Sequence, residues 1–402
     1  MNEIKVNEIW DFLWNKLYYP GTSLIYDRVV WDDKNELIKG LPTIEEIQNK
    51  VPNPCGWGTE MEDSMINGGV MLESIVNRYE VTRDPEMKSY AEKMLAGIKL
   101  CAEVSDKKGF LARSVSPYDG KSYYINSSRD QYTHAISALV RYFECDMCTE
   151  SEKEIIRKIL VGFAEGAEED VTEENEYHLC RADGKPSPVA KMWGKGVWPH
   201  EIHRLHMIYI AAWAVSGDEH WLDMYKKYRD EGLRIANEID FGFVISVGMY
   251  GIFQMQISLR LIYDYEPDAE YKNKYLEIMK KCAAEAKKYR FTDINKYSKE
   301  LVNGDEVPWR KRKFTYEGEC LMSGDAYFVP YSDYFHSILE LRNISEALFI
   351  QSICPDESVP EEQVKECSEV LEFFDFDKHK TYYPIGFMAS YWCMKRYNVM
   401  VK

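Results

Sequence analysis

The sequence contains no long apolar run and little positive charge. No window approaches the ~18 uninterrupted apolar residues of a transmembrane helix. The N-terminal MNEIKVNEIWDFLWNKLYY has no basic segment followed by an apolar one, as a secretory signal would have. The 50 Lys and Arg against 67 Asp and Glu give a net charge of −17. Because nucleic acids and anionic membranes are bound through positive surface, we expect neither as a partner, and we expect a cytoplasmic protein.

The ten cysteines do not form a disulfide or metal framework. They are scattered along the chain, and most lie inside apolar helical patterns, where a free cysteine packs as a small hydrophobe. Cys145 and Cys148 form the only Cys-x-x-C motif, and no second pair at metal spacing accompanies it. We therefore expect reduced thiols, no metal and no cofactor.

What the sequence does contain is a repeat of pattern. Five times, an apolar helix rich in small residues is followed by a short charged turn and an amphipathic helix rich in Lys and Glu. A helix that is apolar on all sides must be buried, and an amphipathic helix covers it from outside. Short turns make the two helices antiparallel neighbours. The five copies span residues 62–103, 128–170, 200–238, 248–289 and 333–375.

The two ends of the chain complete this arrangement. Residues 3–18 are amphipathic and residues 386–398 are apolar and aromatic, so that they pair as an outer and an inner helix of a sixth hairpin. We predict an all-α fold, an (α/α)6 barrel closed into a toroid, with residues 1–402 as one domain. A small β-hairpin is expected within 291–332. An open solenoid is the alternative, but it would expose the apolar ends that closure buries.

The connections from each outer helix to the next inner helix are long and rich in Tyr, Trp and Gly. In a closed ring they project from one mouth, at the N-terminal ends of the inner helices. Long loops on a rigid scaffold usually carry function, and aromatic faces stack on the C–H faces of sugar rings. We predict a carbohydrate cleft at this mouth; aromatic side chains that merely plug the barrel are the structural alternative. The six connections are 52–63, 114–132, 182–203, 239–250, 307–336 and 377–387.

This layout resembles the six-hairpin glycosidase superfamily along essentially the whole chain. It is nearest to the unsaturated glucuronyl and rhamnogalacturonyl hydrolases, in which two aspartates occupy the starts of consecutive inner helices. The resemblance implies that Asp130 is the acid/base and that Asp63 is its partner.

Carboxylates stand at the starts of two predicted inner helices. Glu62 and Asp63 open the first and Asp130 opens the second. A helix N-terminus stabilises a carboxylate, so helix capping alone would also explain them. Glycoside hydrolysis needs two carboxyl groups across the scissile bond, and packed helices lie roughly 8–10 Å apart, which suits an inverting pair. We predict a glycoside hydrolase with Asp130 as general acid and Asp63 or Glu62 activating water.

The substrate is expected to be an oligosaccharide, with a uronic acid as one candidate component. Arg310, in the basic run 310–313, is a candidate to hold its carboxylate, with Arg113 and Arg129 as competitors. A solvated loop is the simpler interpretation of that run, and the neighbouring Glu317, Glu319 and Asp325 are further acid/base candidates. The predicted substrate-binding residues are Trp57, Glu60, Tyr124, Arg129, Gln131, His134, Trp193, Trp198, His200, His203, Arg310 and Tyr331.

Three other functions remain open. A polysaccharide lyase would use a tyrosine–histidine pair, Tyr132 with His134 or Tyr124 with His200. A sugar epimerase would work through His200 and His203, which share a helical face at i, i+3 spacing, while His206 is expected in the core. A non-catalytic glycan-binding protein would need only the aromatic cleft.

Overall fold

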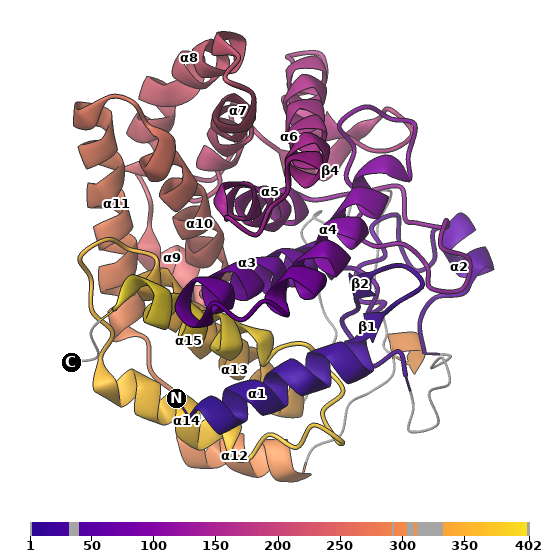
Figure 1. The fold of residues 1–402 in the computed structure, drawn as a ribbon, viewed down its shortest axis with the longest axis vertical. Helices are drawn as coiled ribbons and strands as arrows, with labels where there is room; N and C mark the ends of the chain where they lie inside the picture. The colour runs from indigo at the N-terminus through magenta and orange to yellow at the C-terminus, as the bar shows by residue number, and fades with distance from the viewer. Residues whose placement is uncertain (1, 32–39, 292, 304–308, 312–332, 400–402) are drawn as a thin grey trace.

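The structure is a computed structural model that describes residues 2–31, 40–291, 293–303, 309–311 and 333–399. Six helices form an inner ring: α3 (Ser64–Thr82), α5 (Arg129–Glu144), α7 (His203–Ser216), α10 (Tyr250–Tyr265), α13 (Asp333–Ser352) and α15 (Ile385–Tyr397). Six more lie outside them: α1 (Glu3–Phe12), α4 (Met87–Glu103), α6 (Glu150–Asp170), α8 (Glu219–Ala236), α11 (Ala269–Lys288) and α14 (Glu361–Leu371). Figure 1 shows this arrangement.

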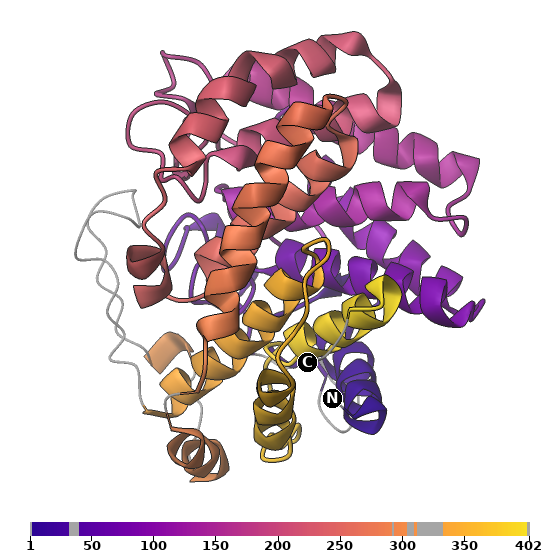
Figure 2. The ribbon, with the colours of Figure 1, turned by 90° about the vertical axis from the view of Figure 1, so that its left-hand side faces the viewer.

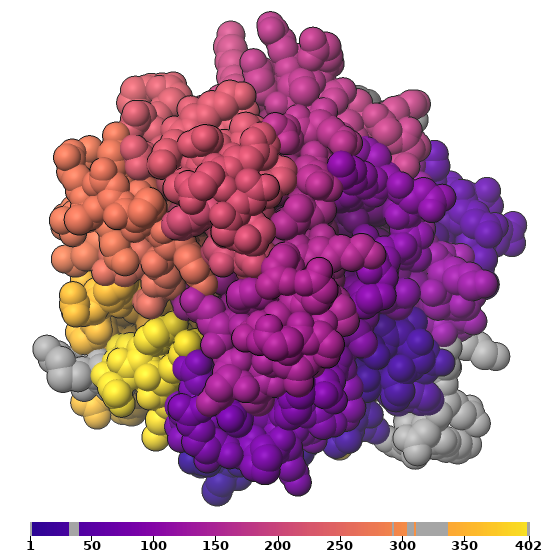
Figure 3. Space-filling view, turned by 45° about the horizontal axis from the view of Figure 1, so that its top comes forward, coloured from indigo at the N-terminus to yellow at the C-terminus, as the bar shows by residue number. Residues whose placement is uncertain are grey.

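The inner helices follow one another around the ring in chain order. Each packs against the next, and α15 packs back against α3. Each outer helix packs against its own inner partner, with α1 against α15. In Figure 2, α1 accordingly lies beside α15, and Figure 3 shows the yellow α15 in contact with the purple surface of the N-terminal half. The predicted all-α barrel is confirmed.

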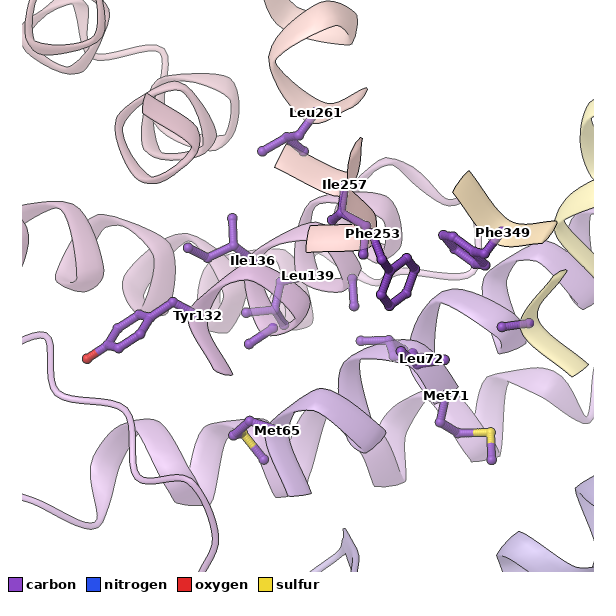
Figure 4. Packing of buried hydrophobic residues seen from close by; sticks show 14 of the residues in the cluster. Met65, Met71, Leu72, Tyr132, Ile136, Leu139, Phe253, Ile257, Leu261 and Phe349 are labelled. Atoms are coloured by element: carbon purple, nitrogen blue, oxygen red, sulfur yellow. The ribbon is translucent and has the colours of Figure 1, made fainter. Parts of the chain in front are cut away.

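The burial pattern explains the two layers. In α3 every residue from Ser64 to Asn77 is buried, as the uniformly apolar pattern predicts, whereas α8 buries a stripe that includes Trp221, Tyr225 and Tyr228. Figure 4 shows side chains of α3, α5, α10 and α13 pointing into a common core. Each large apolar side chain buried there stabilises the fold by about 1.5–3 kcal/mol.

A glycine sets the distance between the first two inner helices. A Cβ atom on Gly69 of α3 would lie 2.6 Å from the backbone carbonyl of His134 on α5, so the two backbones touch at this point. On the preceding residue, Gly68, a Cβ atom would meet nothing within 4 Å. The close approach brings the first turns of α3 and α5, with their carboxylates, next to each other.

Short elements fill the connections. They are the turns η1 (Leu13–Leu17) and η2 (Trp309–Lys311), the helices α2 (Ile44–Gln48), α9 (Phe241–Ser246) and α12 (Ile294–Asn303), and the antiparallel hairpins of β1 (Tyr18–Tyr19) with β2 (Leu24–Ile25) and β3 (His178–Cys180) with β4 (Pro186–Lys191). Neither hairpin was predicted. Of the expected hairpin in 291–332, the described part forms α12 and η2, and residues 312–332 lie outside the described part.

The segment after β2 runs beside the last connection of the ring. Arg28 forms an isolated antiparallel bridge with Thr381, and the Val29 N–H donates to the Lys380 carbonyl. This contact places Asp27 next to the N-terminus of α3. No helix in the described part of the chain is long and apolar enough to span a membrane.

Candidate active site

The first turns of the inner helices meet at one end of the ring. Asp63 is the N-cap residue of α3, Asp130 lies in the first turn of α5, and Arg204 in that of α7. Tyr250 begins α10, and Tyr382 precedes α15 by three residues. Contacts among these side chains place the starts of α3, α5, α7, α10 and α15 at the same end of the ring.

Asp63 is held by side chains from three parts of the ring. Its Oδ1 atom accepts hydrogen bonds from Gln131 Nε2 at 3.0 Å and from Arg113 Nη2 at 3.1 Å. Its Oδ2 atom accepts one from the Tyr382 hydroxyl at 3.3 Å. The Asp63 side chain is 16% exposed. Asp63 is therefore fixed in place more firmly than a simple capping residue, with an edge open to solvent.

Asp27 is a component of this cluster that the sequence analysis missed. Its Oδ2 atom accepts the backbone N–H groups of Glu62 at 2.8 Å and Asp63 at 3.0 Å, and its Oδ1 atom accepts Asn67 Nδ2 at 2.7 Å. It thus caps α3 from a distant segment. Burial, together with the charge of Asp63, raises the pKa of Asp27 to about 7. Because Asp27 lies outside every hairpin, no periodic pattern pointed to it.

Glu62 is a carboxyl group that favours its protonated form. Burial, followed by the charges of Asp63 and Asp27, raises the pKa of Glu62 well above its usual value, although Arg113 opposes the shift. Glu62 Oε2 accepts the Thr59 N–H at 2.9 Å. Its side chain can therefore carry a proton at a pH at which an ordinary glutamate has lost it.

Asp130 has the opposite environment. Burial would raise its pKa, but the guanidinium groups of Arg204 and Arg129 and a hydrogen bond with Tyr250 outweigh burial and lower the pKa of Asp130 to about 2. The Asp130 side chain forms an ion pair with Arg204 and is 27% exposed. With this pKa the Asp130 carboxyl is ionised near neutral pH, whereas the predicted role as general acid requires a proton.

Asp63 and Asp130 lie at the starts of two packed inner helices. Gln131, the residue after Asp130, donates to Asp63. Burial and then the charges of Asp130 and Asp63 together raise the pKa of Tyr250, so both carboxylates lie within electrostatic range of one hydroxyl. The predicted pairing of the α3 and α5 starts is therefore present in the fold.

Helix α13 contributes two further charged side chains, Arg342 and Glu346, which the sequence analysis did not name. The Arg342 guanidinium lies over the Tyr250 ring at 4.3 Å, and its Nε donates to Glu346 at 2.7 Å. Arg342 and Glu346 line a cavity of about 30 Å³ between α3, α10, α13 and α15, which is enough for one water molecule. A larger surface hollow of about 290 Å³ lies apart from the carboxylates, lined by Ile245, Glu285 and residues 288–291.

Arg129, Glu60 and His134 lie around the carboxylates in supporting roles. Arg129 pairs with Glu201 at 2.5 Å and donates to the Lys191 carbonyl at 2.8 Å, while Glu60 pairs with Arg28 at 3.0 Å. His134 lies 2.7 Å from Gln254 Nε2, and burial lowers the pKa of His134 to about 3. Trp57, partly buried, begins the turn before α3.

Both tyrosines proposed for a lyase are committed elsewhere. The Tyr132 hydroxyl donates to the Gly109 carbonyl and accepts the Leu111 N–H, each at 2.9 Å, and Figure 4 shows it pointing away from Phe253. The Tyr124 hydroxyl donates to the Val51 carbonyl at 2.6 Å, and its ring is buried. Both hydroxyl groups are therefore engaged with the backbone, and contact of Tyr124 with substrate remains a prediction.

The histidine cluster divides between cleft and core. Helix α7 begins at His203, so His200 precedes the helix and the predicted shared face does not exist. His203 is buried against His206 and Tyr275, and His206 lies within hydrogen-bonding distance of two backbone carbonyls. Trp193 packs on His206. His203 is therefore a core residue, as His206 is, whereas Trp193 is partly buried and packs against the core.

Arg310 is engaged by the segment that includes α2. Its Nε and Nη2 atoms form a bidentate ion pair with Glu46, at 2.9 Å to Oε1 and 2.7 Å to Oε2. The guanidinium also donates to the carbonyls of Gly40 and Leu41. Its charge fastens η2 to the segment before α2, which argues against the predicted uronate contact. Tyr331, Glu317, Glu319 and Asp325 lie outside the described residues.

Within the described ranges, no group of three or more His, Cys, Asp and Glu side chains has an arrangement that could hold a metal ion. The described cysteines, Cys145 and Cys148 among them, are buried free thiols.

The fold was compared with known proteins. No protein-family model matches the sequence, and no curated protein matches it significantly. Similar solved structures include a sugar epimerase from a ruminal bacterium, with 13% identity, coverage of 98% of both chains and a TM-score of 0.49. A cellobiose 2-epimerase from Bacillus thermoamylovorans has 11% identity, coverage of 99% of this chain and 100% of its own, and a TM-score of 0.48. A D-mannose isomerase has 11% identity, coverage of 98% and 97%, and a TM-score of 0.47. At these scores the function has to be argued from the residues of the cleft.

Proposed function

We propose that the chain is a glycoside hydrolase in which Glu62 is the general acid and Asp130 the ionised partner. One observation carries this proposal: two carboxyl groups, at the starts of adjacent inner helices, have pKa values shifted in opposite directions. Divergent environments for a pair of carboxyl groups are how one site supplies both an acid and a base at one pH. Asp63 is fixed by Arg113 and Gln131, and its charge helps to keep the proton on Glu62.

The chemistry follows from these protonation states. The Glu62 carboxyl donates its proton to the glycosidic oxygen as the bond from that oxygen to the anomeric carbon breaks. The Asp130 carboxylate accepts a proton from the water whose oxygen bonds to the anomeric carbon. Packed helices separated by roughly 8–10 Å leave room for this water, which favours inversion of the anomeric centre.

The test uses Glu62→Gln, which keeps the shape of the side chain and removes its proton. We expect a loss of about 100-fold or more in kcat on natural glycans. On aryl glycosides with an acidic phenol as leaving group, departure needs no proton, so activity should recover. The matched control is Asp130→Asn, whose defect should persist with every leaving group. Near-normal turnover of natural glycans by Glu62→Gln would remove Glu62 from the mechanism.

A sugar epimerase or isomerase is the second candidate, because His200 is available as a neutral base. Burial, followed by Arg204 and Arg129, lowers the pKa of His200 to about 4, while its ring stays partly exposed near Asp130. A product of unchanged mass that gains deuterium from heavy water, with loss of this exchange in His200→Gln, would select this function over hydrolysis. Binding of glycans without turnover would indicate a glycan-binding protein.

A further inference from the structure

Two aromatic rings stack on each other at the surface, and each remains about half exposed. Trp198, in the connection before α7, and Phe243, on α9, stack with ring centroids 5.1 Å apart and an angle of 25° between their planes. Trp198 is 51% exposed and Phe243 is 45% exposed. Asp240 caps α9 by accepting the Phe243 N–H at 3.1 Å, so the platform is held by the backbone. We call this pair the Trp198–Phe243 platform.

The platform continues into the carboxylate cleft through His200. The His200 ring lies nearly parallel to Trp198, with the centroids 6.4 Å apart. Its other side approaches the first turn of α10, where a Cβ atom on Gly251 would lie 3.1 Å from the ring. Burial and then the charges of Arg204 and Arg129 lower the pKa of His200, and the charge of Asp130 opposes them, so these groups lie near the ring. His200 therefore connects the neighbourhood of Asp130 to the stacked Trp198 and Phe243 rings.

The size and shape of the platform fit a sugar ring better than a protein surface. Standard protein interfaces bury about 800 Å² on each partner, far more than two half-exposed rings supply. A pyranose ring matches one or two aromatic faces, because its C–H groups pack against the rings while its hydroxyls stay in water. Exposed large apolar side chains that face a cleft indicate a binding site.

We propose that the Trp198–Phe243 platform is an outer subsite that binds a sugar residue beyond the one held at the carboxylates. The proposal rests on the carbohydrate activity proposed above and adds its substrate class: oligosaccharides long enough to reach from Asp130 past His200. Shorter glycosides bind without using the platform.

The test measures affinity against chain length. Glu62→Gln blocks turnover, and titration calorimetry on this full-length variant follows binding of neutral and uronate-containing glycans, from disaccharides to hexasaccharides. We expect a stepwise gain in affinity when the chain becomes long enough. Adding Trp198→Ala or Phe243→Ala should remove that gain, by about 3- to 10-fold, and leave shorter glycans unchanged. Phe373→Ala, at an aromatic residue that is 46% exposed on another surface, is the matched control and should change nothing.

The outcomes separate the subsite from the activity. Glycan binding with no length-dependent step, or an equal loss at every length in Trp198→Ala, overturns the subsite while the hydrolase proposal stands. Absence of binding and turnover with the whole panel overturns both. Self-association that Trp198→Ala abolishes, with glycan binding unchanged, assigns the platform to a protein interface instead. Long glycans, but not short ones, should protect Trp198 from oxidation by N-bromosuccinimide.

Discussion

Identical carboxyl groups in this site differ in charge because their neighbours differ. Asp130 lies between arginines and has a lowered pKa, whereas desolvation and a neighbouring acid raise the pKa values of Glu62 and Asp27. Desolvation acts on all three, so the arginines decide the outcome. The sequence shows which acids open a helix, but it does not show which cation will face each of them after folding.

The raised pKa of Asp27 predicts that the stability of the protein depends on pH. Its folded pKa of about 7 exceeds its unfolded value, so its contribution is complete below about pH 4 and is lost as pH rises through about 7. The loss is at most about 4 kcal/mol, since each pKa unit corresponds to about 1.4 kcal/mol. Thermal unfolding between pH 4 and 8 should show a falling Tm, and Asp27→Asn should flatten this trend. An unchanged slope in the variant would contradict the assignment.

The same groups predict the pH profile of activity. Activity should fall on the alkaline side as the cluster of Glu62 with Asp27 loses its protons, and it should hold on the acid side until Asp130, with a pKa of about 2, is protonated. Measuring kcat/KM against pH for the wild type and for Asp27→Asn tests this. If kcat/KM of Asp27→Asn still falls at alkaline pH, that fall is assigned to Glu62. A steep loss of kcat/KM near pH 5 would contradict the role of Asp130.

At the scale of single elements, two adjacent glycines of α3 have opposite consequences. Gly69→Ala should force α3 and α5 apart, because its Cβ atom would overlap the His134 carbonyl. We expect a loss of about 1–3 kcal/mol in the free energy of unfolding, with a loss of activity as Asp63 moves away from Gln131. Gly68→Ala, with open space around it, should stabilise the helix by up to about 1 kcal/mol. Urea denaturation compares the two, and equal effects would rule out this contact as the cause.

The helices were predictable because burial imposes a period that the sequence displays. The ends of the helices were less predictable. Helix α7 begins at His203 instead of near residue 200, so His200 precedes the helix and His203 lies in the core. Trp198 was named from composition, but Phe243 was not, because the six-residue helix that presents it is too short for a periodic signal. Asp27 depends on contacts with residues 35 and 36 positions away, which no local pattern encodes.

At the scale of the whole molecule, α1 packs on α15 and is joined to α3 and α4 through Trp10. Trp10 packs against Trp14 and Tyr90 and lies under the Arg78 guanidinium. Trp10→Ala should cost about 3 kcal/mol and lower the midpoints of helical circular dichroism and tryptophan fluorescence together, because a closed ring unfolds as one unit. Ile4→Ala, at a residue of the same helix that is 68% exposed, should be neutral. Circular dichroism and fluorescence transitions at different midpoints in Trp10→Ala would show that α1 unfolds independently of the ring.

The contact between Tyr382 and Asp63 joins residues 319 positions apart. During synthesis, α3 and its acids leave the ribosome long before the segment that carries Tyr382. Asp27, which caps α3, is made early, but the strand bridge from its neighbour Arg28 must wait for Thr381. A nascent chain can therefore build most of the barrel while its cleft is still unfinished. We therefore expect the cleft to be completed late in folding, in a single step, when α15 docks onto the ring.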